Sequence, residues 1–173
     1  MAISLYDISV ANYLQTLGAV ESFLQKGLEH FTEKGTNLDD VVATRLYDDM
    51  LPFAFQIVSV QHHSLHAIEG CKAGVFGPPG AMGALTYADL QKMVTDTIAG
   101  LKALTPAEVN ALEGKDVAFK MGPMVAPFTA ENFVLSFSLP NFYFHAATAY
   151  DILRMKGVNL GKRNFMGAMR MKV

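Results

Sequence analysis

Apolar residues recur every three or four positions over the first 34 residues, a spacing that places them on one face of a long helix. This helix is expected from about Ser4 to Lys34. Gly35 should end it, because glycine adopts the left-handed backbone conformation that often follows a helix C-terminus. A second helix is predicted from about Asp48 to Lys72, with Pro52 in its first turn, where a missing N–H costs least.

Glycine and proline mark where the middle of the chain leaves the helical pattern. The stretch from Gly70 to Gly83 contains Gly77-Pro78-Pro79-Gly80 and is therefore predicted to be a loop. Thr86 and Thr105 each precede an acidic residue by three positions, which is typical of a capped helix start. They predict a long helix near 87–104 and a short helix directly after it.

Two short extended segments are predicted before the last helix. Residues 117–121 and 124–128 flank a Gly-Pro pair and predict a small hairpin or two extended arms. The last long helix should begin at Thr129 and end at Gly157, with Pro140 kinking it or breaking it in two. Four long helices and one small insertion indicate an all-α, up-down four-helix bundle.

Composition limits the kind of protein this is. The 173 residues are 51% apolar and 17% charged, which is enough for one buried core and argues against disorder. A net charge of −2 argues against nucleic-acid or anionic-membrane binding. The single cysteine, Cys71, excludes an internal disulfide. No run reaches about 18 apolar residues, and no basic leader is present, so we expect one cytoplasmic domain over 1–173.

Histidines supply the candidate chemistry. At about 100° per residue, His63 lies beside the main apolar stripe of the second helix, whereas His62 and His66 lie nearly opposite it. On the last helix, Asn141 and His145 are four residues apart on one partly apolar face. We therefore expect His63 and His145 to face the bundle interior, where such proteins build metal or ligand sites. A structural, hydrogen-bonded role for both remains the alternative.

The last helix also carries a recognisable sequence. The run Leu139-Pro140-Asn141-Phe142-Tyr143-Phe144-His145, with 148–154, Gly157-Val158 and 160–165, resembles a bacterial family of unknown function in the DinB/YfiT-like superfamily. Residues 49–52 and His63 match that family as well, so the resemblance covers almost the whole chain. It implies a four-helix bundle with a pocket that holds a divalent metal, often nickel or zinc.

The resemblance further implies a set of metal ligands. The usual set is one histidine on the second helix and an HxxxH pair on the last; His63 and His145 match two of these positions, but Asn141 stands at the third. A neutral amide oxygen binds a transition metal more weakly than an imidazole does. With a metal bound, the implied chemistry is thiol transfer or hydrolysis. Further polar candidates are Tyr47, Asp49 and Tyr150.

A second apolar row lies on the opposite side of the second helix, comprising Leu51, Phe55, Val58, His62 and Leu65. A helix that is apolar on two sides is buried on two sides, and a bundle covers only one of them. Either the C-terminal tail or another subunit should cover the row. We expect a homodimer through this helix, with His62 at the seam.

Two functions remain open from the sequence. One is a metal-dependent thiol transferase or hydrolase acting at His63 and His145. The other is a non-catalytic dimeric bundle that binds a small apolar ligand or a partner protein. Asn141 in a ligand position favours the binding protein, whereas the presence of both histidines favours the enzyme.

Overall fold

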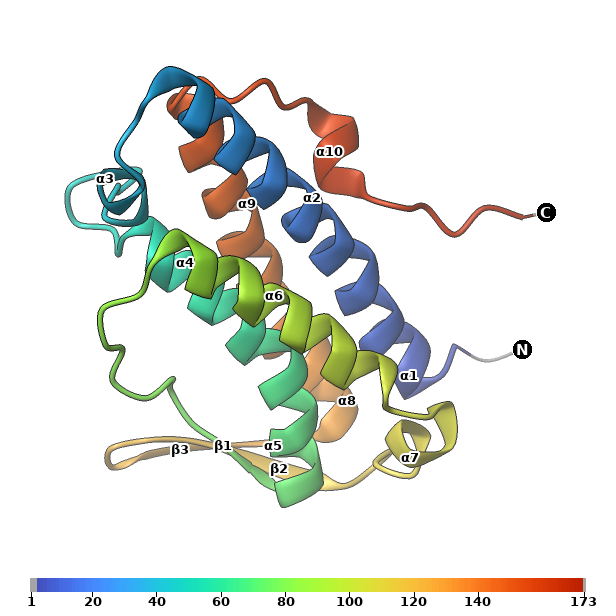
Figure 1. The fold of residues 1–173 in the computed structure, drawn as a ribbon. Helices are drawn as coiled ribbons and strands as arrows, with labels where there is room; N and C mark the ends of the chain where they lie inside the picture. The colour runs from blue at the N-terminus through green and yellow to red at the C-terminus, as the bar shows by residue number, and fades with distance from the viewer. Residues whose placement is uncertain (1–2, 173) are drawn as a thin grey trace.

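The computed structural model describes residues 3–172, and most of them are helical. Four helical rods lie side by side, with a three-stranded sheet across one end (Figure 1). The first rod is α2 (Val10–Lys34) and the third is α6 (Tyr87–Lys102). The second rod consists of α4 (Phe53–Gln61), the π-helical turn η1 (His62–His66) and α5 (Ala67–Ala73). The fourth consists of α8 (Ala130–Phe133), the π-helical turn η2 (Val134–Ser138) and α9 (Leu139–Met155). Since α2 and α4 each pack against both α6 and α9, the rods enclose one core.

Helix starts follow the predicted capping residues. Thr86 accepts a hydrogen bond from the Asp89 N–H at 3.1 Å, and the Asp89 carboxylate accepts the Thr86 N–H at 2.8 Å. These two bonds satisfy backbone donors that the first turn of α6 leaves unpaired. The same logic holds at Thr105, which caps the short α7 (Pro106–Asn110), and at Thr129, which caps α8. The predicted helix ends, Gly35 and Gly157, have φ of 63° and 90°.

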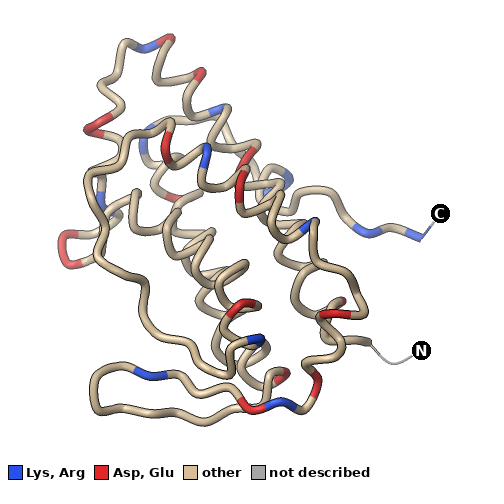
Figure 2. Tube along the Cα trace, turned by 60° about the horizontal axis from the view of Figure 1, so that its bottom comes forward, with Lys and Arg blue, Asp and Glu red and all other residues tan. Residues whose placement is uncertain are grey.

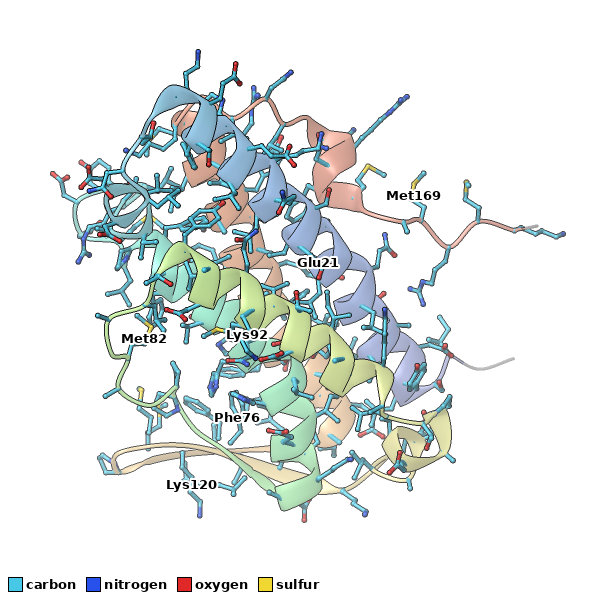
Figure 3. All side chains as sticks on the ribbon, viewed as in Figure 1. Glu21, Phe76, Met82, Lys92, Lys120 and Met169 are labelled. Carbon is cyan, nitrogen blue, oxygen red and sulfur yellow. The ribbon has the colours of Figure 1, made fainter. Side chains whose placement is uncertain are left out.

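The predicted hairpin is confirmed and gains a third strand. β2 (Asp116–Met121) and β3 (Met124–Thr129) pair antiparallel, and β1 (Val75–Phe76) pairs parallel with β2. In this register Phe76 lies opposite Phe119, and both side chains are buried. Figure 3 shows Phe76 between the sheet and the helices, whereas Lys120 projects from the other face of the sheet. The sheet therefore covers one end of the rods.

Three boundaries differ from the prediction. The second rod begins at Phe53, not near Asp48, because Pro52 is extended (ψ 171°) and precedes the first helical residue. The segment between the first two predicted helices contains a short helix, α3 (Leu38–Val42), which Asn37 caps. The first predicted helix is divided at Ser9 into α1 (Leu5–Ile8) and α2.

Pro140 does not break the last rod in two. It lies in the first turn of α9, directly after η2. A π-helical turn shifts the hydrogen-bond register from i→i−4 to i→i−5, and this shift accommodates a proline, which has no N–H to donate. The rod therefore continues through Pro140.

The second apolar row is covered largely by the chain itself. Val58 and His62 are only 9% and 8% exposed, and the connector 77–85 lies against them. The prediction that the tail covers this row is wrong, because α10 (Lys162–Met166) packs against α2. Leu51, at 47% exposed, is the member left open. The homodimer stays a prediction, and the apolar surface that this helix leaves open for a second subunit is smaller than expected.

Within residues 3–172, no helix combines the length and the apolar character that crossing a membrane requires.

Candidate functional site

A cavity of about 200 Å³ lies where the second and fourth rods meet the sheet, and its lining includes all three residues predicted as metal ligands. His63, Asn141 and His145 all line it. Its walls are largely aromatic, and include Phe76 from β1, Phe119 from β2 and Phe137 from η2. The structure thus brings together side chains that the sequence places more than 70 residues apart.

Among residues 3–172, no charged side chain lines this cavity. Residues 51–68, 73–88 and 132–150, which supply all of its walls except Phe119, contain no Asp, Glu, Lys or Arg. These uncharged stretches are the long tan segments of the trace in Figure 2. A ligand in this cavity would therefore meet hydrogen-bonding groups and apolar surface, but no ion-pair partner.

The rings of His63 and His145 lie close to parallel, with centroids 5.9 Å apart and 10° between their planes. Burial lowers the pKa of His63 to about 3, and the neighbouring His62 and His145 add to this effect. Burial likewise lowers the pKa of His145 to about 4, with His62 contributing. Both imidazoles are therefore neutral at physiological pH.

His145 is oriented by a buried amide. Its Nδ1 lies 2.8 Å from Oε1 of Gln56, and Nε2 of Gln56 donates to the Leu51 carbonyl at 2.7 Å. Because the Leu51 carbonyl fixes which end of the amide faces His145, the imidazole must donate its Nδ1–H to Gln56. The lone pair of His145 is then on Nε2, which has no partner among the described residues and is not a buried atom.

His63 lacks such a partner. Its Nδ1 is buried and forms no hydrogen bond with any described residue. Its backbone carbonyl, in the π-helical turn η1, accepts the Ser138 hydroxyl at 2.7 Å, and that hydroxyl also bonds to Tyr13 at 2.6 Å. π-Helical turns occur disproportionately at functional sites, and here both turns border the cavity.

His62 also lines this cavity, which the helical spacing alone did not indicate. Its ring lies face to face with Phe76, with centroids 4.4 Å apart, and its Nε2 is 2.8 Å from the Gly77 carbonyl. The connector after α5 folds back over this side of the helix, and the cavity therefore extends beyond the stripe that His63 borders. Burial lowers the pKa of His62.

The cavity residues meet only part of what the implied divalent metal requires. An ion about 2 Å from one nitrogen of each ring would place the centroids roughly 5 to 6 Å apart, as observed for His63 and His145. However, Asn141 donates its amide N–H to the Phe137 carbonyl, which leaves one weak oxygen donor, and His63 lacks the outer hydrogen bond usual for a ligand. Among the described residues, no three His, Cys, Asp or Glu side chains are grouped to hold an ion. The residues present therefore do not complete the implied three-imidazole site.

The remaining sequence candidates lie elsewhere. Tyr47 is 71% exposed, Asp49 is exposed, and Tyr150 packs against Phe23. Burial, with the Glu131 charge second, raises the pKa of the Cys71 thiol to about 12, which makes it a poor nucleophile. None of the four lines the cavity.

Sequence reasoning missed Gln56, Phe76 and Phe119. Gln56 had a detectable signal, since a polar amide within an apolar stripe needs a partner when buried. The two phenylalanines reach the cavity only through the pairing of β1 with β2, and neither has a local signal.

The fold is similar to that of a solved DinB family protein. A crystal structure of a DinB family member from Shewanella denitrificans superposes with a TM-score of 0.81, covering 98% of this chain and 95% of that one. The two sequences are 22% identical, so this likeness concerns the fold alone. Residues 5–166 match the family described as a domain of unknown function, DUF1993, and the chain belongs to that family. No curated protein sequence matches it.

Proposed function

We propose that this protein is a non-catalytic binding protein for a small, neutral, largely apolar molecule, built on an up-down four-helix bundle. The observation that carries this proposal is the uncharged, aromatic-walled cavity onto which two neutral imidazoles open. Pockets of this composition, with a few polar groups on an apolar wall, are the usual form of small-molecule sites.

Cavity size sets the size of the ligand. Sites for drug-sized molecules occupy about 300–1,000 Å³, whereas an apolar cavity of about 150 Å³ takes up benzene. The present volume of about 200 Å³ suits a molecule with one ring or of similar bulk. A charged ligand would be disfavoured, because the walls offer no counter-ion against its desolvation.

The test uses toluene, detected by saturation-transfer NMR, on the wild-type protein and two matched variants. Phe119→Trp adds bulk inside the cavity, whereas Val125→Trp introduces the same indole at a position on the same hairpin that is 56% exposed. We expect toluene to bind the wild type and Val125→Trp alike, and to bind Phe119→Trp much more weakly. Absence of binding, or equal binding to Phe119→Trp, would contradict the proposal.

A metal-dependent thiol transferase or hydrolase using nickel or zinc is the second candidate. It is favoured by the bond from Nδ1 of His145 to Gln56, since metal-binding histidines usually donate their second nitrogen in this way. Zinc titration of tag-free protein separates the two candidates. If the asparagine is what weakens the site, Asn141→His should bind zinc more than about tenfold tighter than the wild type.

The outcomes of the metal experiment are distinct. Stoichiometric nickel or zinc in wild-type protein, lost in His145→Ala, would favour the enzyme. Weak zinc binding by the wild type, strengthened by Asn141→His, supports the binding protein. His66→Ala is the matched control, because His66 does not line the cavity.

We also propose that the protein forms a homodimer through the exposed end of the second apolar row, where Leu51 is open and Phe55 is half-buried. Size-exclusion chromatography with light scattering tests this directly. We expect twice the monomer mass at micromolar concentration and the monomer mass for Leu51→Glu. A wild-type monomer would contradict this part of the proposal.

A further inference from the structure

The two imidazoles that open onto the cavity differ in which nitrogen holds the proton. His145 must be protonated at Nδ1, because that atom faces the Gln56 oxygen, which only accepts. Its Nε2 therefore offers a lone pair. This Nε2 forms no hydrogen bond with any described residue and is accessible from the cavity.

His63 has the opposite arrangement. A proton on its buried Nδ1 would be a donor without an acceptor, and such orphaned donors are rarer and more costly than an unused acceptor. The proton therefore belongs on Nε2, which is not a buried atom and also lacks a partner among the described residues. One imidazole thus offers a donor and the other offers an acceptor.

A hydroxyl group matches this pair, because its oxygen can donate to Nε2 of His145 and accept from the Nε2–H of His63. Two hydrogen bonds of about 2.8 Å to one oxygen span a distance compatible with ring centroids 5.9 Å apart. A carboxylate cannot donate, and an ammonium cannot accept. An ether accepts from His63 and leaves the His145 lone pair unpaired.

Resting on the proposed function, we propose that the cavity selects a small aromatic alcohol, whose ring lies among Phe76, Phe119 and Phe137 and whose hydroxyl bridges His63 and His145. Gln56 acts as a positioning residue, because it determines which nitrogen of His145 faces the ligand. Gln56 is 2% exposed and does not line the cavity, so its effect on selectivity passes through His145.

Two measurements on the wild-type protein test this inference. The first is the ¹⁵N NMR spectrum of the histidine side chains at pH 7, which distinguishes a protonated from an unprotonated ring nitrogen. We expect His145 protonated at Nδ1 and His63 at Nε2. A wild-type spectrum with His145 protonated at Nε2 would overturn the inference.

The second measurement compares phenol with toluene, which have similar shapes. A purely apolar cavity would prefer toluene, because the phenol hydroxyl would lose its water without compensation. With both imidazoles positioned as described, phenol should bind at least about tenfold more tightly than toluene. In His145→Phe, which removes the acceptor and keeps an aromatic ring, toluene should become the preferred ligand.

Gln56 variants test the positioning role. Gln56→Glu, kept protonated by burial, has an O–H that can donate to the Leu51 carbonyl and an oxygen that accepts from Nδ1 of His145. It should retain both the tautomer and the preference for phenol. Gln56→Leu removes the acceptor and should lose both. Retention of the Nδ1 tautomer in Gln56→Leu would overturn the role of Gln56.

The two proposals fail separately. If toluene binds in the cavity at least as tightly as phenol, the hydroxyl inference falls and the proposed binding function stands. If neither compound binds the wild type, the binding function falls, and the hydroxyl inference falls with it.

Discussion

The α2–α6 pair and the pair formed by the second and fourth rods are built differently. α2 and α6 are uninterrupted α-helices with charged outer faces, where Figure 3 shows Glu21 and Lys92. The other two rods carry no charge over 51–68 and 132–150, and each contains a π-helical turn. Irregular backbone and missing charge coincide with the cavity, so the two pairs of rods differ in both backbone geometry and charge.

Backbone hydrogen bonding shows the same contrast. In α6, the Thr97 hydroxyl donates to the Met93 carbonyl within regular helix. At the π-helical turns, the His63 carbonyl depends on the Ser138 hydroxyl from another rod, and Tyr13 joins the same network. A hydroxyl also joins α6 to α2, since Tyr87 donates to the Leu24 carbonyl at 2.8 Å. What distinguishes the cavity half is a hydroxyl network that reaches the backbone of a π-helical turn.

The largest expected effect is acid destabilisation of the cavity half. The folded pKa values of His63 and His145, about 3 and 4, lie below the ordinary value of 6.5. As pH falls below about 6.5, the unfolded chain takes up protons that the folded chain excludes, so the free energy of unfolding decreases with falling pH. At pH 5 the loss should approach roughly 2 kcal/mol for each histidine.

Urea denaturation at pH 7.5 and pH 5 measures this loss. His145→Phe should show a shallower pH dependence than the wild type, because one of the two groups is absent. Thr97→Val, on α6, removes no titratable group and is the control that should keep the wild-type slope. Equal slopes in all three proteins would contradict the expected contribution of the cavity histidines.

Removing the hydroxyl between rods should have the next largest effect. Ser138→Ala leaves the buried Tyr13 hydroxyl and the His63 carbonyl without this partner, at an expected cost of about 3 kcal/mol in the free energy of unfolding. Thr97→Val removes a buried hydroxyl within regular α6 and should cost less than about 1 kcal/mol. Equal losses would remove the contrast between the two halves.

The smallest expected effect concerns the cap of α6. Thr86→Ala removes the acceptor for the Asp89 N–H and should cost about 1 kcal/mol, without changing toluene binding. Thr95→Ala, which loses only an exposed bond to Glu21, should be close to neutral. Thermal and urea unfolding provide the comparison. A loss of toluene binding in Thr86→Ala would show that the two halves are coupled.

Much of the fold could be predicted because its signals are local. Capping residues such as Thr86 and Thr105, and glycines such as Gly35, act through neighbours within a few positions. The two π-helical turns have no comparable signal, since they depend on contacts between rods. For this reason the sequence suggested a break at Pro140. The local effect of a proline can be read from the sequence, whereas the preceding π-helical turn that accommodates it cannot.

The site was predictable in part. His63, Asn141 and His145 do line one cavity, as the helical spacing and the family resemblance indicated. The position of His62 was not predicted, because it depends on a connector that folds back and places the Gly77 carbonyl against the ring. Helical geometry alone cannot describe a wall that comes from a loop and a sheet.

The parallel pairing of β1 with β2 places one strand of the hairpin at the wall of the cavity, opposite the helices. Phe119 reaches the cavity from β2, whereas the imidazoles project from the rods above it. Substitutions at alternate positions of a single strand can therefore change the capacity of the cavity without disturbing its polar groups. Relatives that share this scaffold could accommodate molecules of different bulk by varying that strand alone.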